Sequence, residues 1–181
     1  MRKRIGKDRV YIYFIDNDDG FIREIISKTD QLNSYNIQIY LRSRDFINDF
    51  ARFKPSRKNV NIVFISNHLE IDENGNSVDM IDVLKKIKAI NSGAEVILYS
   101  DSDNIDTVSL AFHHGVYTAI KKNENFALRL ENNIKGILSQ KNFILRKQSG
   151  ILITEIFIIF VILTAVLLII LYFLFPQWFI I

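Results

Sequence analysis

The sequence predicts an α/β protein, with a five-stranded parallel sheet flanked by helices and one C-terminal transmembrane helix. Two observations carry this prediction. Between Val10 and Leu138, short runs of β-branched and aromatic residues alternate with segments whose apolar residues recur at helical spacing. Further on, residues 156–175 contain no charged side chain and consist almost entirely of Ile, Leu, Val and Phe. The first pattern predicts the sheet and its helices, and the second predicts the membrane span.

Five runs of strand length predict the sheet, and each is bounded by polar or turn residues. These runs are residues 10–15, 36–41, 60–65, 94–99 and 116–120. The intervening segments predict helices that begin after Asp18 or Asp19, over residues 43–53, over residues 77–90, over residues 105–113 and from about Glu124. Because strands and helices alternate strictly, we expect right-handed βαβ units and hence parallel strands.

The apolar segment at residues 156–175 has the length of a transmembrane helix. At a rise of about 1.5 Å per residue it would extend roughly 30 Å, which matches the hydrocarbon thickness of a bilayer. Four basic residues precede it and no charge follows it: Lys135, Lys141, Arg146 and Lys147. The positive-inside rule therefore predicts a single-pass protein of the cell membrane, with a cytoplasmic N-terminal domain and its C-terminus on the opposite side.

Composition narrows the classes of function. The chain of 181 residues has a formal net charge of +3, 49% hydrophobic residues and no cysteine, which excludes disulfides, thiol nucleophiles and cysteine-ligated zinc. Most of the excess of basic over acidic residues lies in the N-terminal arm and in the segment before the apolar run, without the aromatic-basic pattern of a nucleic-acid interface, so no nucleic-acid partner is expected. We expect the following organisation: a basic arm (1–9), the α/β domain (10–138), a juxtamembrane linker or helix extension (139–150), the transmembrane helix (151–175) and a short tail (176–181).

Polar residues follow several of the predicted strands. In open parallel sheets the functional site lies beyond the carboxyl ends of the strands. Those ends carry Asp16, Asn17, Ser66, Ser100 and Lys122. We therefore expect these five residues to form the candidate site.

Three segments together resemble the receiver domain of bacterial response regulators. Residues 13–18 resemble the acidic end of the family's first strand, residues 61–66 the third strand that presents the phosphoacceptor, and residues 94–123 the C-terminal half. Within the last segment, Ser100 matches the switch Ser/Thr, residues 111–115 match the Ala-x-x-x-Gly turn, and Lys122 matches the invariant lysine. The resemblance implies a receiver-like (flavodoxin-like) fold over most of the chain before the apolar run.

The sequence departs from this family pattern at the residues that accept phosphate and bind magnesium. Ser66 stands where the family has its aspartate nucleophile, and a serine hydroxyl does not form an acyl phosphate. The acidic pair that holds magnesium in the family is reduced to Asp16 beside Asn17, so Asp16 alone remains as a candidate metal ligand. Glu70 replaces a common proline, Ala119 the usual switch aromatic, and Asn123 the proline after the lysine. The resemblance thus implies a degenerate, phosphoacceptor-lacking receiver domain with no catalytic residue and no cofactor.

An enzymatic alternative remains open at this stage. The segment from Asp16 to Gly20 approaches the Asp-x-Asp-Gly motif of haloacid-dehalogenase-like phosphatases, with Asp16 as nucleophile and Asp18 as general acid/base in a magnesium-dependent reaction. The competing interpretation is that Asp18 or Asp19 caps the following helix. Similarly, Lys122 either belongs to a phosphate site or pairs with Asp16 to hold two strand ends together.

We expect a membrane-anchored pseudo-receiver that acts as a signalling or protein–protein interaction module without aspartyl phosphotransfer. The resemblance implies a protein partner on the face formed from Ile105 to Leu138, and it leaves homodimerisation open. The lipid bilayer is the expected partner of residues 156–175.

Overall fold

The structure is a computed structural model that describes residues 5–52, 59–72, 75–101 and 105–174. The chain divides into two compact units, of which one spans Arg4–Gln140 and the other contains the helical residues from Lys141 onward. The sheet and its core belong to the first unit.

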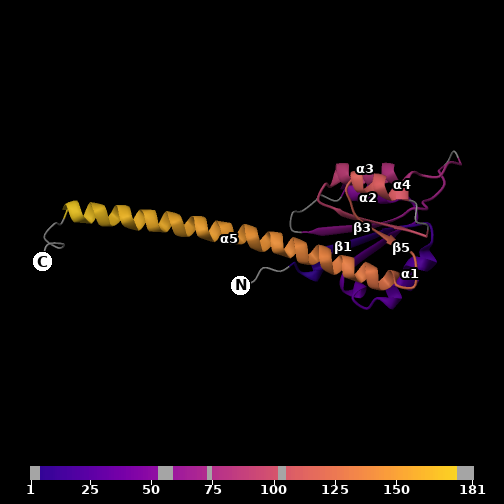
Figure 1. Ribbon diagram of the computed structural model, residues 1–181, viewed down its shortest axis with the longest axis horizontal. Coiled ribbons are helices and arrows are strands. Elements are labelled where there is room, and N and C mark those ends of the chain that lie inside the picture. Colours follow the sequence, from indigo (N-terminus) through magenta and orange to yellow (C-terminus); the bar gives the residue numbers. More distant parts are fainter. Residues whose placement is uncertain (1–4, 53–58, 73–74, 102–104, 175–181) are drawn as a thin grey trace. The chain divides into compact units, whose positions relative to one another are not determined.

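A five-stranded parallel sheet forms the centre of the first unit, in the order β2-β1-β3-β4-β5 (Figure 1). The strands are β1 Val10–Ile15, β2 Asn36–Tyr40, β3 Val60–Ser66, β4 Glu95–Ser100 and β5 Val116–Lys121. Every residue of β3 is buried, as expected for a central strand covered on both faces, whereas β2 and β5 are edge strands with mixed exposure. The predicted sheet is confirmed.

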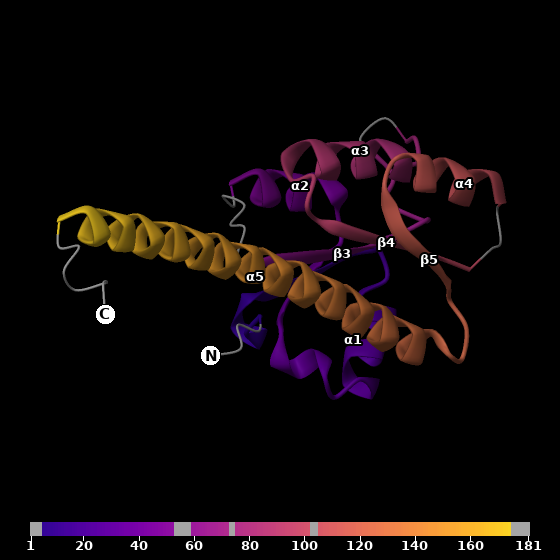
Figure 2. The same ribbon diagram turned by 60° about the vertical axis from the view of Figure 1, so that its left-hand side comes forward.

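Helices cover both faces of the sheet (Figures 1 and 2). One face carries α1 (Asp19–Lys28) and the first turns of α5 (Phe126–Leu174), and the other carries α2 (Ser43–Arg52), α3 (Met80–Ile90) and α4 (Ile105–His113). Successive strand residues point to opposite faces, so β1 sends Ile12 and Phe14 toward α1 and α5, and Tyr13 and Ile15 toward α2 and α3. Each face therefore has its own apolar core.

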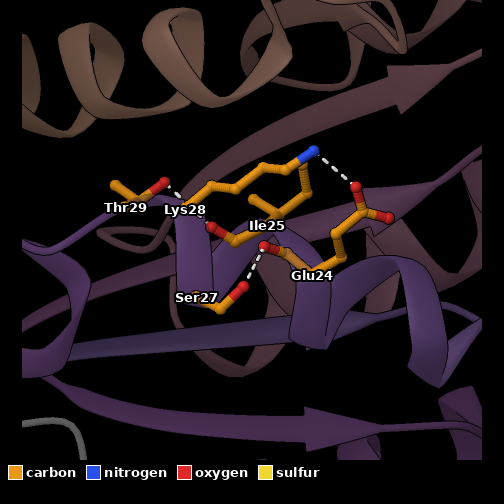
Figure 3. A network of polar contacts seen from close by, with 5 residues as sticks. All are labelled: Glu24, Ile25, Ser27, Lys28 and Thr29. Carbon is orange, nitrogen blue, oxygen red and sulfur yellow. Dashed lines mark hydrogen bonds and ion pairs between the residues drawn. The ribbon is translucent and has the colours of Figure 1, made fainter.

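Local side-chain bonds explain where α1 begins and ends. The Asp18 carboxylate Oδ1 accepts the Phe21 N–H at 2.9 Å, which makes Asp18 the N-cap. At the other end, the buried Thr29 hydroxyl donates to the Ile25 carbonyl at 2.9 Å, and Lys28 pairs with Glu24 along the exposed side (Figure 3). The Asp18 and Thr29 side chains thus satisfy backbone groups near the two ends of the helix, where regular helical hydrogen bonds run out.

Several boundaries differ from the sequence prediction. Helix α3 begins at Met80 instead of residue 77, because the Asp79 carboxylate caps it by accepting the Ile81 N–H at 2.8 Å. The preceding residues form a small antiparallel bridge between Ile71 and Ser77. Helix α5 begins at Phe126 rather than near Glu124, where the Asn123 side chain accepts the Asn125 N–H and turns the chain.

The C-terminal part of the chain continues as helix. Residues 139–150, which the sequence predicts to be a juxtamembrane linker or a helix extension, belong to α5, which runs from Phe126 to Leu174. Among the residues that the structure describes, none of the helices combines the length and the apolar character needed to cross a bilayer, so the predicted span is not confirmed. The side chains at 170–174 and the whole of 175–181, which include the end of that span and the predicted tail, lie outside the described residues, as do residues 1–4 of the basic arm.

Candidate functional site

Asp16 and Lys122 meet at the carboxyl edge of the sheet. Asp16 follows β1 and Lys122 follows β5, and the Lys122 ammonium Nζ lies 3.2 Å from the Asp16 carboxylate Oδ2. The Asp16 side chain is 1% exposed and that of Lys122 is 13% exposed. In such a buried pair each charge compensates the desolvation of the other. The pairing role expected for Lys122 is therefore the one that the geometry shows.

The backbone around Asp16 is held on both sides. The Asp16 N–H donates to the Tyr40 carbonyl at 3.2 Å, which ties the end of β1 to β2. The other carboxylate oxygen, Oδ1, accepts the Asp18 N–H at 3.1 Å. Asn17, between them, is exposed and does not join the buried pair. The structure thus brings Asp16 into the candidate site and leaves Asn17 out of it.

Ser66 lies at the end of β3 and is 1% exposed. Its hydroxyl oxygen accepts the His68 N–H at 3.2 Å, so it closes a turn in its own loop. The following residue, Asn67, donates its N–H to the Tyr99 carbonyl at 2.9 Å, which joins this loop to the end of β4. The Ser66 side chain therefore has a local structural role in the loop.

Ser100 closes β4 and is 8% exposed. Its carbonyl oxygen accepts the Lys122 N–H at 2.8 Å, which holds the start of the Lys122 side chain against the neighbouring strand end. Ser100 is thus joined to Lys122 through the backbone, while Asp16 is joined to it through the side chain.

Two aromatic residues that the sequence analysis missed complete the surroundings of Lys122. The ammonium lies 4.5 Å from the centre of the Phe21 ring and 5.3 Å from the centre of the Tyr99 ring. Phe21 comes from α1, and Tyr99, which is 1% exposed, comes from β4. A ring face attracts a cation, so Phe21 and Tyr99 add to the attraction of Asp16. The position of Tyr99 directly before Ser100 could have indicated that it lies near the site. Because Tyr99 ends an apolar run, the sequence favoured a position in the core instead.

The Tyr99 hydroxyl is buried in an acidic environment. Burial raises the pKa of Tyr99 well above its ordinary value of 10.0, and the nearby Asp16 carboxylate raises it further. Among the described residues, neither the Tyr99 hydroxyl nor Asp16 Oδ2 has a hydrogen-bond partner of good geometry. Lys122 therefore meets Asp16 as a close charge instead of through an aligned hydrogen bond.

A half-buried carboxylate, Glu70, joins the loop after β3 to a neighbouring helix. Glu70 Oε1 accepts both the N–H of Ser43, at 2.7 Å, and the Ser43 hydroxyl, at 2.6 Å. This contact joins the loop after β3 to the first turn of α2, where unpaired N–H groups and the helix dipole favour an anion. Sequence reasoning noted Glu70 only as a departure from the receiver pattern, because its partner lies 27 positions earlier in the chain.

The residues present do not fit a magnesium site. The Asp16 oxygens face an ammonium and a backbone N–H, Asn17 is exposed, and Ser66 offers a hydroxyl where a carboxylate would be needed. Within the described ranges, no group of three or more His, Cys, Asp or Glu side chains is placed to hold a metal ion. Asp16 is therefore a poor magnesium ligand in this arrangement.

The geometry also weakens the phosphatase alternative. That reaction needs Asp16 free to attack phosphorus and Asp18 free to transfer a proton. Instead, Asp16 is paired with Lys122, and the Asp18 carboxylate caps α1 through the Phe21 N–H. The capping interpretation of Asp18 is confirmed.

Comparison with known proteins finds similarity at the level of structure. No family model matches the sequence, and no curated protein matches it. A receiver domain protein (CheY-like) from Methanospirillum hungatei JF-1 superposes with a TM-score of 0.60 at 14% identity, over 72% of this chain and 94% of that one. A two-component response regulator from Clostridium difficile gives 0.59 at 17% identity, over 74% and 98%. The beryllofluoride-activated NtrC4 receiver domain dimer gives 0.59 at 14% identity, over 72% and 98%.

At these identities the similarity establishes the fold. The matched share of this chain agrees with the extent of the sheet and its helices, and the strand order β2-β1-β3-β4-β5 belongs to the same doubly wound class. The expectation drawn from residues 13–18, 61–66 and 94–123 is thereby confirmed as to fold. The chain has the α/β fold of response-regulator receiver domains.

Proposed function

We propose that this chain is a membrane-anchored pseudo-receiver, a signalling or protein–protein interaction module that works without aspartyl phosphotransfer. The proposal rests on the side chains at the carboxyl ends of β1, β3 and β5, where a receiver domain would carry out phosphotransfer. Asp16 is paired with Lys122, and Ser66 presents a hydroxyl that closes its own loop. Phosphotransfer to a receiver fold needs a free carboxylate nucleophile and a metal, and these residues supply neither.

The face built from α4, β5 and the start of α5 is the proposed docking surface for a protein partner. Three large apolar side chains are solvent-exposed on these helices: Leu110 (47%), Phe112 (49%) and Leu128 (58%). Contact with a protein partner would remove these apolar side chains from water, which favours binding. The NtrC4 receiver domain is described as a dimer, which supports a homodimer as one form of this contact.

The membrane part of the proposal rests on the sequence and on the exposure of the helix. Residues 156–169 of α5 are exposed in nearly all positions, although almost all are apolar. A helix that is apolar all round is stable when lipid or protein surrounds it. The basic residues before this segment, such as Lys141 and Lys147, support a cytoplasmic position for the receiver-like domain.

Phosphorylation of the full-length chain tests the proposal. We expect the detergent-solubilised protein to remain unmodified when it is incubated with acetyl phosphate and Mg²⁺, because Asp16 is paired with Lys122 and the end of β3 carries Ser66 in place of a carboxylate. Intact-protein mass spectrometry would detect the added phosphoryl group. Modification of wild-type protein that is lost in Asp16→Asn would overturn the proposal in favour of phosphotransfer or phosphatase chemistry.

A matched gain-of-function variant shows whether the fold still supports receiver chemistry. Ser66→Asp with Asn17→Asp restores the two missing carboxylates, so we expect it to take up phosphate from acetyl phosphate in a Mg²⁺-dependent manner. Ser66→Asn with Asn17→Asp is the control, because it has similar side-chain volume without the nucleophile. Equal behaviour of the two variants would show that Ser66 does not occupy the phosphoacceptor position.

A further inference from the structure

The surroundings of the Lys122 ammonium form a cage of three side chains. Asp16 Oδ2 lies 3.2 Å from Nζ, and the ring centres of Phe21 and Tyr99 lie at 4.5 and 5.3 Å. The three residues come from the end of β1, the first turn of α1 and β4. Their positions are fixed by the core, because Asp16 and Tyr99 are each 1% exposed and the Phe21 ring packs against Phe126 at 5.4 Å.

The electrostatic character of this cage selects a cation. The carboxylate carries the negative charge, and both aromatic rings present the negative face of their quadrupoles to the ammonium. Asp16 Oδ2 and the Tyr99 hydroxyl are both buried, and the proximity of the Asp16 carboxylate adds to the acidic character of this space. A phosphoryl group or another anion would be repelled by the same arrangement.

Backbone hydrogen bonds, and not the Lys122 side chain, hold the strand ends that carry Asp16 and Lys122. The Lys122 N–H is held by the Ser100 carbonyl at 2.8 Å, and the Asp16 N–H is held by the Tyr40 carbonyl at 3.2 Å. Lys122 reaches the cage through its flexible methylene chain, and its side chain retains 13% exposure. Shortening this side chain therefore vacates a cation site while the strand ends stay in place.

We propose that Asp16, Phe21 and Tyr99 form a binding site for a primary alkylammonium group, and that Lys122 is its resident ligand, tethered through the backbone. The site recognises a cation at the edge of a fold whose relatives are receiver domains, and this recognition is independent of whether the chain takes up phosphate. Removal of the tethered ligand leaves a site that an amine in solution fills.

Chemical rescue of a truncated lysine tests this inference in the full-length, detergent-solubilised chain. Lys122→Ala removes three carbons and the ammonium, which together correspond to n-propylammonium. We expect a lower unfolding temperature for this variant, and a saturable recovery when n-propylammonium chloride is added. At a concentration equal to the dissociation constant, the recovery should be about 2 °C. Near-UV circular dichroism, which reports ordered aromatic side chains, would follow the transition.

The controls separate binding from general salt effects. Potassium chloride at the same ionic strength and 1-propanol at the same concentration should give no saturable recovery, because one lacks the alkyl chain and the other lacks the charge. Lys122→Ala combined with Phe21→Leu should lose most of the recovery. Lys121→Ala, an exposed neighbour outside the cage, should show no response to the amine. Equal responses to n-propylammonium and potassium, or recovery in Lys121→Ala, would overturn the inference.

A spectroscopic measurement on wild-type protein covers the case in which Lys122→Ala does not fold. Ring currents from Phe21 and Tyr99 should shift the Lys122 ε-methylene protons upfield of those of exposed lysines in selectively labelled protein, and Phe21→Leu should reduce this shift. If the variant folds only with n-propylammonium present, the inference is supported. If no amine restores folding and the wild-type Lys122 protons resonate with the exposed lysines, the cage does not hold this ammonium and the inference fails.

Discussion

At the scale of single residues, two buried tyrosines allow the effects of burial and of hydrogen bonding on stability to be separated. Tyr99 and Tyr13 are 1% and 3% exposed, and each lies in a strand of the central sheet. The Tyr13 hydroxyl donates to the Asn61 side-chain oxygen at 3.5 Å, whereas the Tyr99 hydroxyl has no partner of good geometry among the described residues. A buried hydroxyl without a partner costs roughly 1–3 kcal/mol. The two residues therefore form a natural comparison.

Tyr99→Phe should stabilise the protein. The substitution removes the unsatisfied hydroxyl and keeps the ring that packs beside Phe126 and faces Lys122. We expect the free energy of unfolding to rise by about 1 kcal/mol in urea denaturation. Tyr13→Phe is the matched control and should lose about 0.5–1 kcal/mol, because it removes a hydroxyl that has a partner. A loss of stability in Tyr99→Phe as large as that in Tyr13→Phe would mean that the Tyr99 hydroxyl is hydrogen-bonded.

The same two residues predict a loss of stability in alkali. Burial raises the pKa of both Tyr13 and Tyr99 above the ordinary value of 10.0. Below that pH both are protonated in the folded and unfolded states, so they add no pH dependence. Above it the unfolded chain loses protons that the folded chain keeps, and each residue should remove about 1.4 kcal/mol per pH unit until its folded-state pKa is reached. Urea midpoints between pH 8 and 11 would measure this, and Tyr13→Phe/Tyr99→Phe should show a flatter profile.

At the scale of the elements, strand and helix identity followed from periodicity, whereas the contacts between elements did not. The alternation of residue types was enough to predict all the strands, and the polar strand ends placed Asp16 and Lys122 in one candidate site, with their pairing as one of two alternatives. The cage residue Phe21 escaped prediction because its ring position depends on how α1 docks on the sheet. The Glu70–Ser43 contact escaped it because nothing local in either segment points to a partner so distant in the chain.

The connection from α4 to β5 requires glycine. Gly115 has a φ of +88°, which side-chain-bearing residues rarely adopt, and a Cβ there would lie 3.3 Å from Lys88 Cε. Gly115→Ala should therefore lower the free energy of unfolding by about 1–2 kcal/mol. Gly93→Ala is the control, since Gly93 has no positive φ and its Cβ would meet only Asn91 Oδ1 at 3.4 Å. Equal effects of both substitutions in urea denaturation would contradict the backbone explanation.

At the scale of the whole molecule, the two units give separate predictions. The unit spanning Arg4–Gln140 contains both apolar cores of the sheet, so its stability should not depend on the apolar part of α5. Deletion of residues 151–181 should leave the urea midpoint of the receiver-like domain within error of the full-length value. It should also move the protein from the membrane pellet to the soluble fraction after cell lysis, because the apolar residues that favour lipid are removed.

The distribution of the protein between the membrane pellet and the soluble fraction tests whether residues 156–175 anchor it, and this test does not depend on the stability of the receiver-like domain. Extraction with concentrated urea serves as the control, since it releases proteins held at a membrane only by other proteins. Full-length chain that is released by urea, or that is soluble without it, would contradict anchoring by residues 156–175. A truncated chain that remains with the membranes would place the attachment in the receiver-like domain instead.

The position of α5 in the chain has a consequence for biosynthesis. Its residues Phe126, Leu130, Ile134 and Ile137 are buried on the sheet face that α1 alone cannot cover. During translation all five strands leave the ribosome before these residues do, so Phe64, Ile97 and their neighbours stay uncovered until the final helix docks. Exposed apolar surface of this kind binds chaperones and promotes aggregation. The nascent chain should therefore recruit chaperones until about residue 137 has emerged, immediately before the still more apolar part of α5 follows.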